Sequence, residues 1–279
     1  MNSVKTCSAA QILISVVQGT LIGLGAVLPG ISGGVLCVVF GIYKTIISFL
    51  ANPLHNLKAN IMKLLPYGIG GVIGFVGSSR LLSFLLEKYP APSVCLFIGL
   101  ICGMLPALFR EAGEQGRSKA SFVSMGVSMV MVFTLLIGLK LFSVEITPDS
   151  FWYGFCGVCL ALSVIAPGMS FSTLLMPLGL YEPFVAGIGH MNMAILLPGG
   201  IGCLATVILL SRAVDTLFEN HHSVAFHAII GIVIAATIMI IPVASFMESA
   251  ASCLCNSICI AAGIIAALLL DKFNQKYTT

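Results

Sequence analysis

Long apolar runs, separated by short polar stretches, occupy almost the whole chain. The runs approach or exceed the roughly 20 residues that a helix needs to cross the hydrocarbon core of a bilayer. We therefore predict ten helical segments, at roughly 10–28, 33–51, 64–86, 93–109, 120–143, 150–166, 170–189, 194–214, 224–242 and 250–270. The polar stretches between them include EKYPAP, REAGEQGRSKAS, SVEITPDS and ENHHS.

The composition excludes an ordinary water-soluble protein. Of the 279 residues, 58% are hydrophobic and 8% are charged, and the mean hydropathy is +1.10. Soluble domains carry roughly a quarter charged residues, so this chain has too little charge to cover a surface that faces water. The long runs also lack the alternating pattern of a membrane barrel. The sequence predicts an all-α integral membrane protein, and its net charge of +3 is too small to indicate a nucleic-acid partner.

An internal repeat divides the chain into two similar halves. PGISGG with a following GIYK matches PGMSFS with GLYE at an offset of 138 residues, as from Pro29 to Pro167. After a loop that is six residues shorter in the second half, an offset of 132 aligns LLPYGIGG with LLPGGIGC and Arg80 with Arg212. We predict one transmembrane domain over 1–279, with repeat one at about 10–143 and repeat two at about 150–270.

The number of membrane crossings in each repeat sets the relative orientation of the halves. If a PG segment links two spanning helices, the repeat has five spans; if it is a re-entrant tip, the repeat has three spans and a hairpin. Both counts are odd, so the second repeat would be inverted relative to the first. A single discontinuous span through each PG segment would instead make the repeats parallel. We expect two inverted-topology repeats, each a PG-tipped broken or re-entrant helix pair plus three transmembrane helices.

The distribution of lysine and arginine predicts that both termini face the cytoplasm. Positively charged residues collect in the loops that would then lie inside, as the positive-inside rule requires. These residues are Lys5, Lys44, Lys58, Lys63, Arg110, Arg117, Lys119, Lys272 and Lys276. The outside connectors carry mainly acidic residues, such as Glu145, Asp149 and Glu248.

The two PG segments are the first candidate site. Non-helical backbone at membrane depth is tolerated only where it is buried in protein or lines a wet cavity, and free N–H groups at a helix start suit an anion. The candidate substrate-binding residues are Pro29, Gly30, Ser32, Gly33, Gly34, Pro167, Gly168, Ser170, Ser172 and Thr173. One such motif alone would favour a simple capped turn, but two copies at equivalent points of an inverted repeat favour a binding site.

Arg80 and Arg212 are the second candidate site, since each lies inside an apolar segment at an equivalent place in the repeat. Intramembrane arginines are costly and usually functional, and a guanidinium matches a phosphate bidentately. Snorkelling to the nearer interface is the alternative. Three acidic residues follow the arginines and would either pair with them or carry protons for coupling. They are Glu87, Asp215 and Glu219.

The sequence indicates neither a metal site nor a cofactor. No cluster of His, Cys, Asp and Glu has metal-ligand spacing. No nucleophile lies beside a candidate base in a recognisable catalytic motif, so the chain is not expected to be an enzyme.

The paired motifs PGISGG…GIY and PGMSFS…GLY, with the two Ser-Arg pairs, resemble the bacterial undecaprenyl-phosphate translocase family of the PopT type. The resemblance covers roughly 12–270. It implies a flippase of the bacterial cytoplasmic membrane that returns the polyprenyl-phosphate carrier from the outer to the inner leaflet, for reuse in peptidoglycan and other envelope synthesis. One departure is that Phe171 and Ser172 stand where the first copy has Gly33 and Gly34, so the two segments are not expected to contribute equally.

Two other functions stay open at this stage. Integral undecaprenyl-pyrophosphate phosphatases also have inverted repeats and a PG-x-S segment, but theirs continues with arginine, where this chain has Gly33 or Phe171. No Asp or Glu precedes Glu87 either, which argues against hydrolysis. A carrier of small soluble anions would fit the same site. The expected partners are the polyprenyl-phosphate lipid and membrane lipids, and a homo-oligomer is compatible with the sequence.

Overall fold

The computed structural model describes most of the chain, and its gaps fall mainly in the first half. The described backbone comprises residues 9–28, 36–37, 40, 42, 45–46, 57–141, 146–165 and 170–278. Within these ranges, the description leaves out the side chains of 9–10, 57–63, 140, 165, 211–212, 214–215, 218–219 and 273–278.

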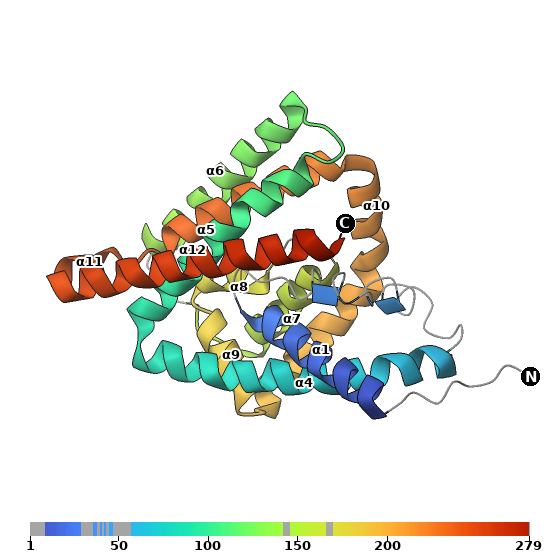
Figure 1. Cartoon of the computed structure of the whole chain (residues 1–279). Coiled ribbons are helices and arrows are strands. Elements are labelled where there is room, and N and C mark those ends of the chain that lie inside the picture. Colours follow the sequence, from blue (N-terminus) through green and yellow to red (C-terminus); the bar gives the residue numbers. More distant parts are fainter. Residues whose placement is uncertain are drawn as a thin grey trace, which may run out of the picture.

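Helices make up all the regular structure in the described residues, with no strand among them. In chain order they are α1 (Ala9–Val27), α4 (Leu57–Lys88), α5 (Pro90–Ala112), α6 (Lys119–Leu141), α7 (Ser150–Ile165), α8 (Phe171–Leu175), the 3-10 helix η1 (Met176–Leu178), α9 (Tyr181–Gly189), α10 (Met193–Met239), α11 (Val243–Glu248) and α12 (Ala250–Thr278). Figure 1 shows their arrangement.

In the described part of the chain, six stretches are long and apolar enough to span a membrane: Leu64–Lys88, Pro90–Ala112, Lys119–Leu139, Met193–Leu210, Asn220–Glu248 and Ala250–Lys272. Three belong to each half of the sequence. Two shorter apolar helices, Gln11–Val27 and Ser150–Val164, precede the PG segments. The expectation of an all-α membrane protein is confirmed, and the chain is a multi-pass membrane protein.

The predicted segment 33–51 lies largely outside the described residues; the other predicted segments correspond to helices, but two connectors differ from expectation. Only Tyr89 separates α4 from α5, because Pro90 is the first residue of α5, where its missing N–H costs nothing. ENHHS does not interrupt α10, which runs from Met193 to Met239 with a kink at His221 (φ −134°, ψ 37°). A local backbone distortion therefore replaces a loop between the two spans of α10.

The segment after the second PG motif is bent rather than straight. The sequence predicts one helical segment over 170–189, whereas α8 with η1 and α9 meet at an angle of 117°. Gly179 lies at the bend with φ 70°, in the left-handed region that a residue without Cβ adopts at little cost. The GLY of the repeated motif therefore makes a turn that hydropathy alone did not reveal.

Glycines bring α1 into close contact with α4. A Cβ added at Gly19 would overlap the carbonyl oxygen of Tyr67, and one added at Gly70 would overlap the carbonyl oxygen of Val16. Small residues let membrane helices approach until their backbones touch, where packing rather than hydrophobicity stabilises the pair.

Helices α7 and α10 approach each other in the same way. A Cβ at Gly157 would overlap the carbonyl oxygen of Gly199, and one at Gly202 would overlap that of Gly154. Each half of the chain thus has a glycine-mediated pair, formed by the helix before its PG segment and a later spanning helix.

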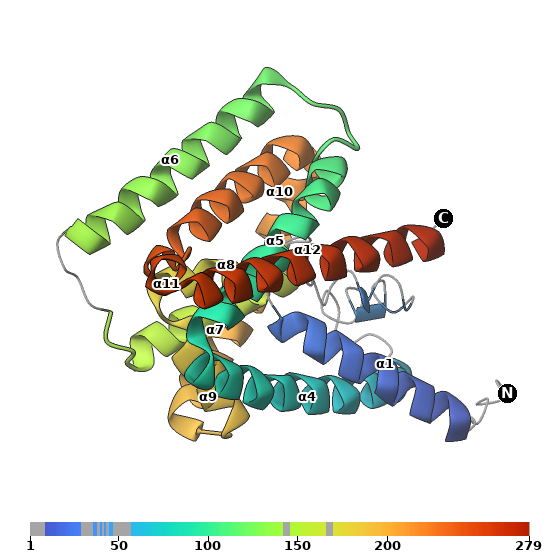
Figure 2. The same ribbon diagram turned by 60° about the vertical axis from the view of Figure 1, so that its left-hand side comes forward.

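Helices of the two halves also pack against each other. α5 lies against α12, and α6 lies against the C-terminal part of α10, as both views show (Figures 1 and 2). The Ser124 hydroxyl donates to the Val224 carbonyl (2.9 Å), and the Ser128 hydroxyl donates to the Ala228 carbonyl (2.8 Å). These two serines of α6 therefore face a helix of the other half.

Candidate functional site

The described polar side chains of the PGMSFS segment are buried together. Ser170, Ser172 and Thr173 expose 5%, 0% and 3% of their surface. The hydroxyl oxygens of Ser170 and Ser172 lie 2.6 Å apart, and the Thr173 hydroxyl donates to the Ser170 carbonyl (2.7 Å). We call these three residues the hydroxyl cluster. Since only one O–H can lie between two oxygens, the cluster keeps a second serine O–H for another acceptor.

The serine hydroxyls are not engaged as helix caps. Ser170 occupies the N-cap position of α8 in extended conformation, but its side chain makes no capping hydrogen bond. α8 has only five residues, so little helix dipole is available at its start. The polar chemistry of this segment therefore rests on its side-chain hydroxyls.

The other residues of the PG segments lie outside the described residues. These are Pro29, Gly30, Ser32, Gly33 and Gly34 in the first copy, and Pro167 and Gly168 in the second. Their predicted part in binding stays a prediction.

Arg80 reaches from α4 to the end of α9. Its Nε donates to the carbonyl oxygen of Gly189, the last residue of α9. The C-terminal end of a helix carries partial negative charge and unpaired carbonyls, which suit a guanidinium. One N–H of five is used, so Arg80 keeps four donors. Among the described contacts, none joins Arg80 to the hydroxyl cluster.

The predicted acidic partners of the arginines are only partly described. Glu87 lies on the exposed surface of α4, one residue before its end. The only ion pair among the described side chains joins Arg110 to Asp271, so Arg80 and Glu87 do not form a salt bridge. The side chains of Arg212, Asp215 and Glu219 lie outside the described residues.

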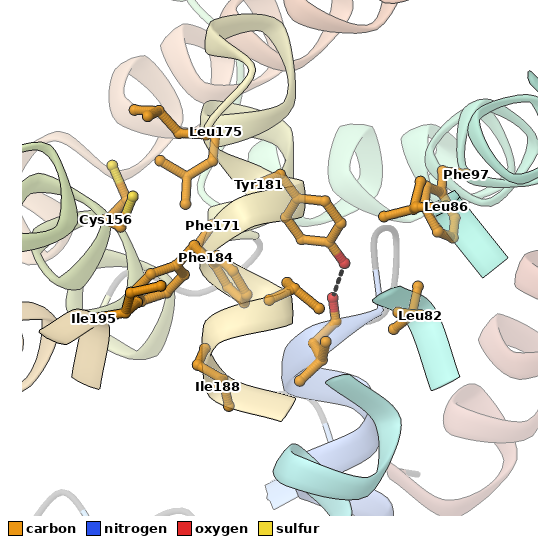
Figure 3. Close-up of a cluster of buried hydrophobic side chains, with 14 of the residues drawn as sticks. Leu82, Leu86, Phe97, Cys156, Phe171, Leu175, Tyr181, Phe184, Ile188 and Ile195 are labelled. Atoms are coloured by element: carbon orange, nitrogen blue, oxygen red, sulfur yellow. Dashed lines mark hydrogen bonds between the residues drawn. The ribbon is translucent and has the colours of Figure 1, made fainter. Parts of the chain in front are cut away.

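Tyr181 lies beside the hydroxyl cluster, and no sequence pattern predicted a role for it. Its side chain is 2% exposed, and its hydroxyl donates to the carbonyl of Val27 (2.8 Å), the last residue of α1 (Figure 3). This bond joins the second half to the residue two places before Pro29. The repeat does single out this tyrosine, because the match of Tyr43 with Tyr181 helps to define the alignment of the two halves.

Aromatic packing explains why the second PG segment carries a phenylalanine. Phe171 is fully buried, with its ring centroid 5.8 Å from that of Tyr181 and 6.2 Å from that of Phe184. Phe97 of α5 contacts Tyr181 edge-on at 6.3 Å. Phe171 therefore holds the hydroxyl cluster against α9, a role that glycine has no side chain to fill.

The described polar groups can donate hydrogen bonds to an anion. These groups are the buried hydroxyl cluster at the start of α8 and Arg80 of α4, which keeps free donors. No group of three or more His, Cys, Asp or Glu residues in the described part of the chain is placed to hold a metal ion.

Comparisons with known proteins agree with the sequence resemblance. The family model of the VCA0040-like proteins, described as undecaprenyl phosphate translocase-like, matches residues 22–258. A Vibrio cholerae protein named polyprenyl-phosphate transporter is 23% identical over 240 residues, covering 80% of this chain and 75% of its own. A Staphylococcus aureus protein of the same name is 26% identical over 243 residues, covering 82% and 86%. No solved structure matches. The chain belongs to the undecaprenyl phosphate translocase-like family.

Proposed function

We propose that this protein transports polyprenyl phosphate, undecaprenyl phosphate in particular, from the outer to the inner leaflet of the bacterial cytoplasmic membrane. The observation that carries the proposal is a buried hydroxyl cluster beside a bent helix pair in a multi-pass chain of this family. Both relatives named above are called polyprenyl-phosphate transporters. The returned carrier would be reused in peptidoglycan and other envelope synthesis, and the protein is a transporter rather than an enzyme.

The proposed architecture is a pair of inverted-topology repeats, over about 10–143 and 150–270 of the single domain, with both termini in the cytoplasm. Equivalent helix contacts support the repeat itself. The Gly19–Tyr67 contact corresponds to Gly157–Gly199 at the sequence offsets of 138 and 132. Gly70 with Val16 corresponds to Gly202 with Gly154 at the same offsets.

The phosphate is proposed to bind at the hydroxyl cluster and at the free donors of Arg80. The repeat adds the equivalent groups of the first half and Arg212 to the proposed site. The full set is Pro29, Gly30, Ser32, Gly33, Gly34, Arg80, Pro167, Gly168, Ser170, Ser172, Thr173 and Arg212. Hydrogen bonds between charged groups are the stronger ones, and arginine recognises phosphate through two parallel N–H donors.

Moving only the head group through protein makes this transport feasible. A charge at the bilayer centre costs roughly 3 kcal/mol or more, whereas the polyprenyl tail can stay in lipid throughout. The proposed site would be exposed to each side in turn, as in other inverted-repeat transporters. Glu87, Asp215 and Glu219 are the proposed proton carriers if transport is coupled to a gradient.

Ligand-dependent thermal unfolding of the purified protein tests head-group recognition. A ligand that binds only the folded state raises the unfolding midpoint. We expect polyprenyl phosphate to raise it in a dose-dependent way, polyprenol of the same length to have no effect, and soluble phosphate to fail to compete. An equal shift with polyprenol would contradict phosphate recognition.

The same preparation separates the two rival functions. Release of inorganic phosphate from polyprenyl pyrophosphate would identify a phosphatase. Stabilisation by soluble phosphate alone would identify a small-anion carrier. The proposed function predicts neither result.

A further inference from the structure

The α9 helix belongs to the second half by sequence, but its polar anchors are in the first half. We infer that Tyr181 and Arg80 are positioning residues that clamp the two ends of α9 to α1 and α4. The clamp itself is inferred from contacts between the helices. Only its consequence for transport rests on the proposed function.

At the start of α9, the anchor is the hydroxyl of Tyr181. It donates to the carbonyl of Val27 at 2.8 Å, and both side chains are buried, with 2% and 0% exposed. The carbonyls of the last helical turn have no partner within their own helix. The tyrosine therefore satisfies a buried acceptor at the end of α1, and α1 in turn fixes the position of Tyr181.

At the other end of α9, the anchor is the guanidinium of Arg80. Its Nε donates to the carbonyl of Gly189, again in the last turn of a helix. The fit is close, since a Cβ on Gly189 would lie 3.0 Å from both Cγ and the backbone nitrogen of Arg80. Glycine at 189 is what lets α9 approach α4 near enough for this bond.

Packing between the anchors agrees with the clamp. α9 contacts α4 more extensively than it contacts any helix of its own half. Leu82 and Leu86 of α4 share a buried cluster with Val185 and Ile188 of α9. Figure 3 labels Leu82, Leu86 and Ile188 near the Tyr181 bond. α9 therefore docks mainly on the first half, while Phe184 still packs on Phe171 of its own half.

The consequence is a division of the molecule that differs from the sequence repeat. α9 moves with α1 and α4, and the bend at Gly179 joins this body to α8 and the hydroxyl cluster. Gly179 already has φ 70°, where a glycine can change its dihedral angles with little steric cost. Head-group binding at the cluster is thereby linked through one turn to a helix held by the opposite half.

Hydrogen exchange of the full-length purified protein tests the clamp independently of transport. A nine-residue helix is marginal alone, so the protection of the α9 amides depends on docking. Tyr181→Phe removes one hydroxyl, and Gly189→Ala adds one methyl group at the opposite end. We expect each to raise exchange in peptides covering 181–189 about tenfold, the scale of one lost buried hydrogen bond. Tyr153→Phe and Gly200→Ala are the matched controls.

Transport by the same variants in liposomes tests what the clamp does. Both variants are expected to lower the maximal rate of polyprenyl-phosphate movement about tenfold and to leave the half-saturating lipid concentration unchanged. The maximal rate of the double variant should be no lower than that of the slower single variant, because freeing either end already undocks α9.

Each outcome has a distinct meaning. Unchanged exchange over 181–189 in both variants overturns the clamp. Raised exchange with wild-type transport rates overturns its role as a positioning device. Losses that multiply in the double variant show two independent local defects and also overturn it. If the variants raise exchange over 181–189 but the wild-type protein transports no polyprenyl phosphate, the clamp is supported and the proposed function is refuted.

Discussion

Replacing Gly70 or Gly202 by alanine is expected to lower the free energy of unfolding by about 1–3 kcal/mol or more. The added methyl of Gly70→Ala would overlap the backbone of Val16 in α1, and that of Gly202→Ala would overlap the backbone of Gly154 in α7. A backbone cannot rotate aside as a side chain can, so the helices must separate. Thermal unfolding of the purified variants measures the loss, together with the yield of monodisperse protein.

The chain provides a matched control for each substitution, two residues earlier on the same helix. Gly68 and Gly200 have no atom within 4 Å of an added Cβ. Alanine there should be neutral or stabilising by up to about 1 kcal/mol, because glycine is the poorer helix former. Equal midpoints for Gly70→Ala and Gly68→Ala would contradict the close helix contact. Unequal losses at Gly70 and Gly202 would contradict their equivalence in the proposed repeat.

Replacing Arg80 by alanine is expected to reduce transport of polyprenyl phosphate by about 10- to 100-fold at limiting lipid, the range of one lost charged hydrogen bond. Two functions are removed together, the anchor on Gly189 and the donors proposed for the phosphate. The half-saturating lipid concentration should therefore rise and the maximal rate should fall. This combination separates Arg80→Ala from Tyr181→Phe, for which only the maximal rate is expected to change.

Arg117→Ala is the control for the loss of an exposed arginine. Arg117 lies between α5 and α6 and donates to the carbonyl of Phe109, away from the hydroxyl cluster. Its replacement should leave both transport parameters unchanged. By the repeat, Arg212→Ala should impair transport as Arg80→Ala does. Wild-type rates from both Arg80→Ala and Arg212→Ala, in correctly inserted protein, would rule out the arginines as head-group ligands.

Hydropathy predicted the spanning helices because membrane insertion depends on long apolar runs. The helices α4, α5, α6 and α12 correspond closely to the predicted segments. The turn at Gly179 was missed because hydropathy averages over a window longer than one turn. The sequence predicted a loop at ENHHS, where the structure has a kink at His221, because a short polar stretch is compatible with a loop or with a kinked helix.

The candidate site was predictable as far as local motifs describe it. Burial of Ser170, Ser172 and Thr173 followed from their place in a PG segment within apolar sequence. The partners of Tyr181 and Arg80 are contacts over 154 and 109 residues of sequence, and no local pattern specifies them. The repeat named these residues by their equivalence to Tyr43 and Arg212, but only the packing of α9 on α1 and α4 gives them a structural role.

Transbilayer movement of a fluorescent polyprenyl phosphate in liposomes tests whether the protein transports this lipid. An impermeant reductant quenches only the label in the outer leaflet of the liposomes. Transport brings label from the inner to the outer leaflet, so quenching continues beyond the fraction that was in the outer leaflet at the start. Liposomes with the wild-type protein are expected to show this continued phase, unlabelled polyprenyl phosphate is expected to slow it, and labelled phosphatidylcholine is expected to lack it. Quenching that stops at the level of protein-free liposomes would contradict transport of polyprenyl phosphate by this protein.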